Sequence, residues 1–481
     1  MPEMSNRSRW IALYVLCLAT LMIVLDVTIV GVALPSIKDN LHFSQSGLAW
    51  VVNAYLLTYG GCLLLGGRLG DLYGHRRLFL AGLSLFTVAS LLCGLSTTTW
   101  MLVGARAVQG VGGAVTSAVS FGLVMTLFTE PADRAKAMGI MGFIASGGGS
   151  IGVLLGGVIT DVISWHWIFL VNVPIGVLVV LLSLRLLEGG PGFAVTRRLD
   201  IVGAVTVTGA LMLAVYGINT HPGGWGSATT IGLIAGAVVL LGAFVAWESR
   251  AEAPLMPLRL FLHHNLAVAN VAGVLWAAAM FAWFFMSALY LQLVLGYSPL
   301  QVGLAFLPGN LIMGALSISI SAKLVMKYGY RKPLAVGLLS AAVGLALFAR
   351  APVHGHFLAD VLPSMILLGF GAGIAFNPVL LAAMGDVEPR EAGLASGIVN
   401  TAFMMGGALG LAVLTSVASA RTSSVSDSVS HAAALTSGYH AAFLGGAIAA
   451  LLAATIGGLL LHEASPQSHG EYEAAPATGL E

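Results

Sequence analysis

The chain has 481 residues, of which 58% are hydrophobic and only 9% are charged, and its mean hydropathy is +0.94. Soluble proteins carry about a quarter charged residues, so water is not the main solvent of this protein. The net charge is +1 and basic residues never run beyond two in a row, which argues against a nucleic-acid partner.

Fourteen apolar runs are each long enough to cross the hydrocarbon core of a bilayer, which takes about 20 helical residues. They fall at 11–34, 48–67, 78–96, 100–124, 137–160 and 167–187, then at 199–217 and 228–247, and finally at 265–292, 301–322, 333–350, 358–382, 391–419 and 440–461. The first run is too long for a signal peptide, so we expect it to be retained. The predicted fold is an all-α integral membrane protein with two six-helix bundles and two extra central spans.

This arrangement sets the expected domain boundaries. They are a cytoplasmic N-terminal tail at 1–10, a first bundle at 11–190, a linking pair with its flanking loops at 191–260, a second bundle at 261–461 and a disordered cytoplasmic tail at 462–481. The three cysteines, Cys17, Cys62 and Cys93, lie inside predicted spans without disulfide or metal-ligand spacing, so we expect them to pack.

Basic residues predict the orientation, because Lys and Arg concentrate in cytoplasmic loops. Of the 21 basic residues, 17 fall on one side of the predicted membrane, and only Lys38, Arg350 and Arg421 fall on the other. The remaining one, Arg106, lies within a span. Both termini are therefore expected in the cytoplasm, and the protein in the cell membrane.

Two loops indicate an internal repeat, which is the usual construction of transporters. Between the second and third spans the chain reads Gly-Gly-Arg-Leu-Gly-Asp-Leu-Tyr-Gly-His-Arg-Arg over residues 66–77. The equivalent loop of the later block, residues 321–332, ends Tyr-Gly-Tyr-Arg-Lys and has no acidic residue.

Asp26 and Arg106 are ionisable residues inside predicted spans. Inserting either side chain at the centre of a membrane helix costs about 2.5–3.5 kcal/mol of free energy, even on the more lenient scales. At 1.5 Å per residue they lie ~12 and ~9 Å from the outer end of their spans, so they are expected to pair. One interpretation is a structural ion pair. The other is proton coupling, in which Asp26 carries the proton and Arg106 tunes it.

Other candidate residues fall into three groups. Glycines of the fifth span serve either tight packing or a helix that slides: Gly148, Gly152, Gly156 and Gly157. Loop residues either latch helix ends or form a solvated basic loop: Gly67, Arg68, Asp71, Gly74, Arg76 and Arg77. Polar and aromatic residues face either a substrate cavity or, for the aromatics, lipid: Asn53, Tyr55, Gln109, Trp276, Met280, Trp283, Asn310, Asn377 and Asn400.

These motifs resemble those of the fourteen-helix drug:proton antiporters of the major facilitator superfamily, over essentially the whole chain. Residues 67–77 resemble the superfamily's loop motif, 25–35 its first-helix motif in the fourteen-helix branch, and 165–176 the segment entering the sixth span. The fourth-helix motif, whose Arg is implicated in proton coupling, is matched by Leu102, Arg106, Gln109, Gly110, Gly112 and Ala114.

One departure concerns the fifth-helix antiporter motif, in which Gly-Pro precedes Gly-Gly. Here Gly152-Val153 precedes Gly156-Gly157, so the proline is absent and the direction of transport is open. The resemblance implies proton-driven efflux of amphiphilic drugs or antibiotics by a monomer without a cofactor. The alternative is a facilitator or symporter of a metabolite or ion. An enzyme or a sensor is disfavoured, since the spans hold no metal-like residue set and no soluble output domain follows them.

Overall fold

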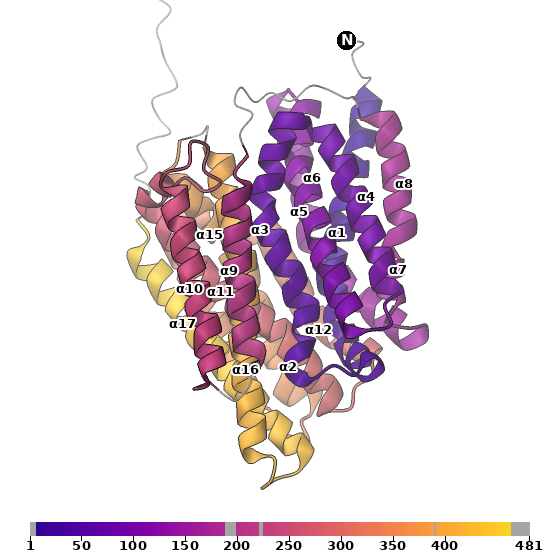
Figure 1. Cartoon of the computed structure of the whole chain (residues 1–481), viewed down its shortest axis with the longest axis vertical. Helices are drawn as coiled ribbons and strands as arrows, with labels where there is room; N and C mark the ends of the chain where they lie inside the picture. The colour runs from indigo at the N-terminus through magenta and orange to yellow at the C-terminus, as the bar shows by residue number, and fades with distance from the viewer. Residues whose placement is uncertain (1–5, 188–198, 221–224, 389–390, 463–481) are drawn as a thin grey trace, which may run out of the picture.

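Helices account for the regular structure in residues 6–187, 199–220, 225–388 and 391–462, the parts of the chain that our computed structural model describes. Figure 1 shows them running roughly along one direction as an elongated bundle. The first block contains α1 (Asn6–Leu41), α2 (Gln45–Leu48), α3 (Trp50–Tyr73), α4 (His75–Gly94), α5 (Thr99–Leu127), α6 (Pro131–Val162), α7 (Trp167–Leu170) and α8 (Asn172–Leu186). The middle pair is α9 (Ile201–Thr220) and α10 (Ala228–Glu248).

The second block follows a short helical turn, η1 (Leu258–Leu262). It contains α11 (His264–Leu293), α12 (Pro299–Leu316), α13 (Ala322–Tyr328), α14 (Arg331–Phe348), α15 (Leu362–Gly385), α16 (Ala392–Val425) and α17 (His431–Leu460). Two five-residue π-helical turns, η2 (Ser317–Ser321) and η3 (Phe357–Val361), lie before α13 and α15.

Thirteen helices in the described parts of the chain are long and apolar enough to cross a membrane. The one predicted span not among these thirteen, at 137–160, is occupied by the 32-residue helix α6. Every predicted apolar run therefore coincides with a helix, and the predicted all-α membrane fold is confirmed. Its orientation in the membrane stays a prediction.

Several helices continue beyond the predicted apolar runs, and the predicted domain boundaries stay predictions. Helix α1 begins at Asn6, inside the predicted tail 1–10, while α16 ends at Val425 and α17 begins at His431. The expected loop at 420–439 is therefore largely helical. A helix satisfies its own backbone hydrogen bonds, so it can continue into water with the polar residues that a hydropathy reading assigns to a loop.

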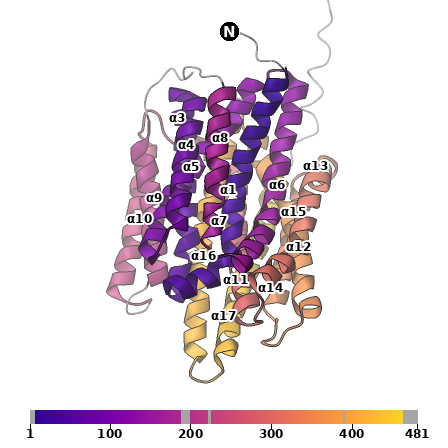
Figure 2. The ribbon, with the colours of Figure 1, turned by 90° about the vertical axis from the view of Figure 1, so that its right-hand side faces the viewer.

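The two bundles pack against each other in a reciprocal way. Helix α6, the fifth span of the first block, packs on α12, the second span of the later block. Conversely α3, a second span, packs on α16, a fifth span. Figures 1 and 2 show α3 and α6 on different sides of the first block. This exchange of equivalent partners is what a two-fold internal repeat produces.

The repeated loops have the same local structure in both blocks. Gly74 and Gly329 end their helices at φ of 92° and 75°, a backbone region that favours glycine. Two residues later, Arg76 donates from Nη2 to the carbonyl of Leu184 at 2.8 Å, and Arg331 donates from Nε to the carbonyl of Gly458 at 3.0 Å. Each arginine therefore caps the C-terminal end of its own block's last helix.

The middle pair flanks the seam between the bundles. Helix α9 packs on α10 and also on α3 and α16, so it covers one interface between the two blocks (Figure 1). A side-chain contact supports this position, since Thr415 Oγ1 on α16 lies 3.4 Å from Asn219 Oδ1 on α9.

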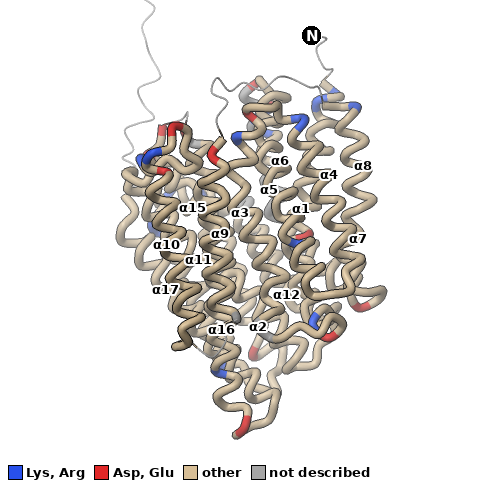
Figure 3. Tube along the Cα trace, in the orientation of Figure 1, with Lys and Arg blue, Asp and Glu red and all other residues tan. Residues whose placement is uncertain are grey.

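Charged residues gather at the two ends of the described bundle, with most Lys and Arg at the end where the N-terminus lies (Figure 3). The positions of the basic residues in the sequence predict this distribution. The expected tail after His462 and the basic pair Arg197 and Arg198 lie outside the described residues.

Candidate functional site

Asp26 on α1 and Arg106 on α5 form a buried ion pair. The Nη1 of Arg106 lies 2.5 Å from Asp26 Oδ2, and the two side chains are 1% and 0% exposed. The sequence argument from depth predicted this pairing. A charged pair excluded from water is stable only when its remaining hydrogen-bonding atoms also find partners.

Neighbouring side chains supply those partners. Asp26 Oδ1 accepts hydrogen bonds from Gln109 Nε2 at 2.7 Å and from Asn172 Nδ2 at 3.1 Å. Arg106 donates from Nε to the carbonyl of Val51 at 3.0 Å, and Gln109 also donates to Ser90 Oγ at 2.7 Å. Five helices of the first bundle, α1, α3, α4, α5 and α8, therefore meet at this cluster, which we call the Asp26 cluster.

Tyr55 on α3 lies beside this cluster. Its ring centroid is 4.3 Å from the guanidinium carbon of Arg106, within cation–π range, and its ring stacks on Tyr59 with centroids 5.7 Å apart. The hydroxyl of Tyr55 is buried without a hydrogen-bond partner. The ring rather than the hydroxyl is thus the part of Tyr55 that contacts the ion pair.

A cavity of about 330 Å³ lies between the two bundles, and Tyr55 also lines it. The first bundle contributes residues of α1, α3 and α6, and the second contributes α11, α12, α15 and α16. Aromatic and sulfur-containing side chains dominate its wall on the second bundle: Trp276, Met280, Phe281, Phe284, Phe285, Phe306, Met313, Phe376, Phe403 and Met404. Such a concave apolar site with few polar groups is typical of small-molecule binding.

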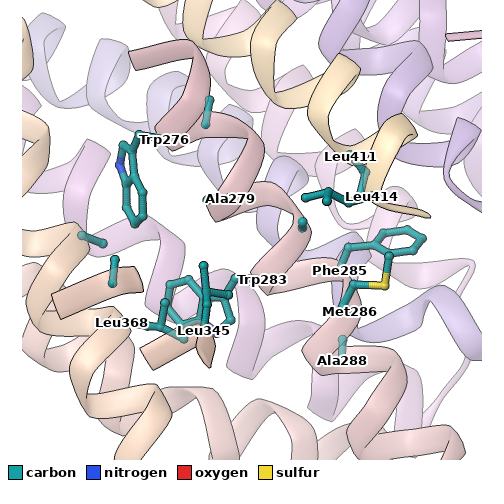
Figure 4. Close-up of a cluster of buried hydrophobic side chains, with 14 of the residues drawn as sticks. Trp276, Ala279, Trp283, Phe285, Met286, Ala288, Leu345, Leu368, Leu411 and Leu414 are labelled. Carbon is teal, nitrogen blue, oxygen red and sulfur yellow. The ribbon is translucent and has the colours of Figure 1, made fainter. Parts of the chain in front are cut away.

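The predicted cavity residues divide between several places. Tyr55, Trp276, Met280 and Asn310 line the cavity. Trp283 is not a wall residue, and its ring packs against Phe284 and Phe306, with ring centroids 4.4 and 6.2 Å away. Figure 4 shows Trp276 and Trp283 along one side of α11, with Trp283 near Leu345 and Leu368.

The remaining predicted residues also lie away from the main cavity. Gln109 belongs to the Asp26 cluster, and Asn53 is buried with both amide atoms unpaired. Asn377 donates to the carbonyl of Ser317 at 2.8 Å, which satisfies an acceptor at the π-helical turn η2. Asn400 lines a much smaller hollow beside Trp276 and Phe403.

The predicted glycines of α6 lie where this helix contacts α1 and α12. A Cβ at Gly156 would lie 2.7 Å from the carbonyl oxygen of Ile29, and a Cβ at Gly157 would lie 2.6 Å from that of Pro299. Gly152 faces Thr28, and Gly148 faces Val24. Backbones approach closely here because no side chain intervenes.

In the loop motif, Asp71 contacts His75 at 3.5 Å and Arg76 caps α8, while Gly67 packs loosely near Ala118. Arg77 is exposed, and Arg68 is partly buried. Sequence reasoning missed Asn172 and Ser90 as partners of the Asp26 cluster. The available signal was that Asn172 is a polar residue inside a predicted span.

The described residues contain no group of three or more His, Cys, Asp or Glu placed to hold a metal ion. Of the three cysteines, Cys17 and Cys93 are buried and Cys62 is partly buried, and each is a free thiol.

The sequence matches the Major Facilitator Superfamily over residues 16–411, so the chain belongs to this family of membrane transporters. The resemblance inferred from the motifs is thereby confirmed. The family consists of transporters rather than enzymes, and the protein is an integral protein of the cell membrane that acts on small molecules.

Three similar proteins are named for antibiotic export or resistance. The cephamycin export protein CmcT of Amycolatopsis lactamdurans is 39% identical over 449 residues, covering 92% of this chain and 91% of that protein. The puromycin resistance protein pur8 of Streptomyces alboniger is 38% identical, covering 86% and 82%. The lincomycin resistance protein of Streptomyces lincolnensis is 37% identical, covering 86% and 85%.

A solved structure of a bacterial homologue of the human lysosomal transporter Spinster has the same fold. Its TM-score is 0.67 at 15% sequence identity, and the match covers 96% of this chain and all of that chain. The nucleoside transporter NupG matches with a TM-score of 0.65 at 13% identity, covering 93% and 98%.

Proposed function

We propose that the protein exports small amphiphilic organic compounds, antibiotics among them, in exchange for protons and by alternating access. One observation carries this proposal: the buried Asp26 cluster lies next to the apolar cavity. The side chain of Tyr55 contacts both, since it packs on Arg106 and lines the cavity. Export as the direction is supported by the cephamycin export protein at 39% identity, and the two relatives at 37–38% identity, which are antibiotic resistance proteins, are consistent with it.

Asp26 is suited to carry the proton. It is fully buried, and its charged form is held by Arg106, Gln109 and Asn172. Protonation would cancel the charge that Arg106 pairs with, so Arg106 and the aromatic ring over it would have to shift. The proton state of Asp26 can thus bias the helices that meet at this cluster, which is what coupling requires.

The reciprocal interfaces support alternating access. Helices α6 and α12 on one side, and α3 and α16 on the other, are equivalent pairs about the cavity. Rocking one bundle against the other opens one end as it closes the other, around a fixed central site. The small residues of α6 at Gly156 and Gly157 allow its neighbours to slide at close range.

The alternative function is a facilitator or symporter of a metabolite or ion. The absence of the motif's proline after Gly152 is the observation that favours this alternative, because that motif is associated with export. A facilitator would need no buried acid, whereas a symporter would move its substrate inward with the proton. The direction of flux under an imposed pH gradient separates the three possibilities.

The test uses purified protein in liposomes with an imposed pH gradient, and measures puromycin flux and proton flux together. We expect puromycin to move against the proton flow, and Asp26→Asn to abolish both fluxes. Asp427→Asn is the matched control, because Asp427 is exposed between α16 and α17. Puromycin and protons moving in the same direction, or flux that ignores the gradient, would refute the antiport proposal.

A further inference from the structure

The cavity wall contains no charged side chain among the described residues. Its polar members are Thr28, Tyr55, Tyr59, Trp276, Asn310 and Ser317. The nearby carboxylate, Asp26, is not a wall residue and is 0% exposed, with its oxygens occupied by three donors. A ligand in the cavity therefore meets no counter-charge.

This lack of charge decides which ligands are stable there. A permanent cation loses its hydration on entering an apolar site, and without a carboxylate that loss is not recovered. The ring faces of the wall offer cation–π attraction, but this is weaker than the hydration of an ion. An uncharged aromatic compound loses little on entering and gains contact with the rings of Phe281, Phe284 and Phe306.

Asn310 provides a polar point in this apolar wall. It lies on α12, is 1% exposed, and its Oδ1 has no hydrogen-bond partner. Buried amides are normally satisfied, so the unpaired Oδ1 of Asn310 is an acceptor for a ligand that carries a hydrogen-bond donor. Its position one residue after Gly309, where α12 touches α15 backbone to backbone, holds it in place.

We infer that the cavity binds uncharged aromatic compounds carrying a hydrogen-bonding group for Asn310, and that permanent cations are poor ligands. This inference rests on the proposed function, which it deepens by naming the substrate class. It makes Asn310 a residue that determines specificity, because a site built to hydrogen-bond its ligand rejects an analogue that lacks the group.

The test measures binding to the full-length protein in nanodiscs, with empty nanodiscs as the blank. The probes are N-phenyl-1-naphthylamine, which is uncharged and has one N–H, its N-methyl derivative, which lacks the N–H, and ethidium, a permanent cation. Trp276 in the wall provides a fluorescence signal for occupancy. We expect N-phenyl-1-naphthylamine to bind at least about tenfold more tightly than either of the others.

Two substitutions at Asn310 sharpen the test. Asn310→Leu is expected to remove the preference for the N–H probe over its N-methyl derivative. Asn310→Asp, nearly identical in shape, is expected to raise the affinity for ethidium by about tenfold, since it supplies the missing counter-charge. Asn40→Asp is the control, because Asn40 is exposed near the end of α1, outside this cavity, and the change should leave all three affinities unchanged.

The inference is overturned if ethidium binds the wild-type protein as tightly as N-phenyl-1-naphthylamine, if neither binds, or if Asn310→Leu keeps the N–H preference. The wild-type comparison needs no variant, so it holds even where a substitution prevents folding. Selective binding without proton-driven flux would refute the proposed function and leave the site chemistry standing. If ethidium binds as tightly as N-phenyl-1-naphthylamine and is exported with the proton gradient, the proposed function stands and the inferred substrate class is refuted.

Discussion

Asp26 and Arg106 have a structural role and a proposed coupling role, and these can be separated. Replacing Asp26 alone with Asn leaves a buried guanidinium without its counter-charge, which destabilises a protein by about 3–5 kcal/mol. Neutralising both residues, with Asp26→Asn and Arg106→Gln, removes the charge problem. We therefore expect the double variant to recover most of the lost thermal stability in detergent, but none of the proton-coupled transport.

The comparison is a double-mutant cycle, with unfolding followed by intrinsic fluorescence and transport followed by internal pH in liposomes. If the double variant restores transport together with stability, the pair is a structural lock and Asp26 is not the proton carrier.

Tyr55 provides a second residue-scale prediction, since its ring contacts Arg106 and lines the cavity, while its hydroxyl has no partner. Tyr55→Phe keeps the ring and removes an unpaired buried group, so stability and transport should stay close to wild type. Tyr55→Ala removes the ring that lies between the ion pair and the cavity, so water in the cavity can reach the pair. We expect proton leak without substrate, measured as pH decay in liposomes. Equal behaviour of the two variants would show that the ring does not separate the two sites.

The pairing of Asp26 with Arg106 was predictable, because two ionisable groups at one depth in a bilayer have few other partners. The places of Gln109, Trp283 and Asn377 were not. Whether a polar residue in a span faces the cavity, a neighbouring helix or its own bundle depends on helix rotation, and apolar runs without a polar face leave that rotation undetermined. Only the packing of the helices settles it.

At the scale of the element, α6 contains glycines in two different settings, which gives a matched comparison. A Cβ at Gly157 would press on the backbone of Pro299, whereas at Gly139 nothing lies within 4 Å. We expect Gly157→Ala to slow transport by about tenfold, because α6 and α12 must separate there or distort. Gly139→Ala should leave the rate unchanged and slightly favour the helix.

The measurement is the initial rate of proton-driven efflux at equal amounts of protein in the membrane. A loss of rate in both variants would mean that α6 needs flexible glycines along its length rather than close contact at its end.

The number and order of the helices could be predicted because each apolar run matches the thickness of the bilayer. Their ends could not, as α16 and α17 demonstrate by continuing through Ser- and Thr-rich residues near Arg421. The π-helical turn at Ser317 could not be predicted either, because it depends on a partner from another helix: the side chain of Asn377 donates a hydrogen bond to the carbonyl of Ser317. Hydropathy reports transfer into lipid, and these features depend on tertiary partners instead.

For the whole molecule, side chains of the two bundles contact each other at the end near Asp161 and Ser298. Ser298 Oγ lies 3.3 Å from Asp161 Oδ2, and nearby Gln292 Nε2 donates to the carbonyl of Val32 at 2.8 Å. Each contact joins the first bundle to the second. The charge distribution predicts that this end faces the outside, where an exporter must open to release its substrate.

A disulfide across this contact should therefore stop transport. We expect Asp161→Cys with Ser298→Cys, in a chain with Cys17, Cys62 and Cys93 replaced by Ala, to lose puromycin flux on oxidation and to regain it on reduction. The control is Ser298→Cys alone in the same cysteine-free chain. It has no partner thiol to form a bridge, so transport should continue on oxidation. Full transport by the oxidised Asp161/Ser298 variant would mean that the bundles need not part here, and the rocking mechanism would have to be replaced by motion within a single bundle.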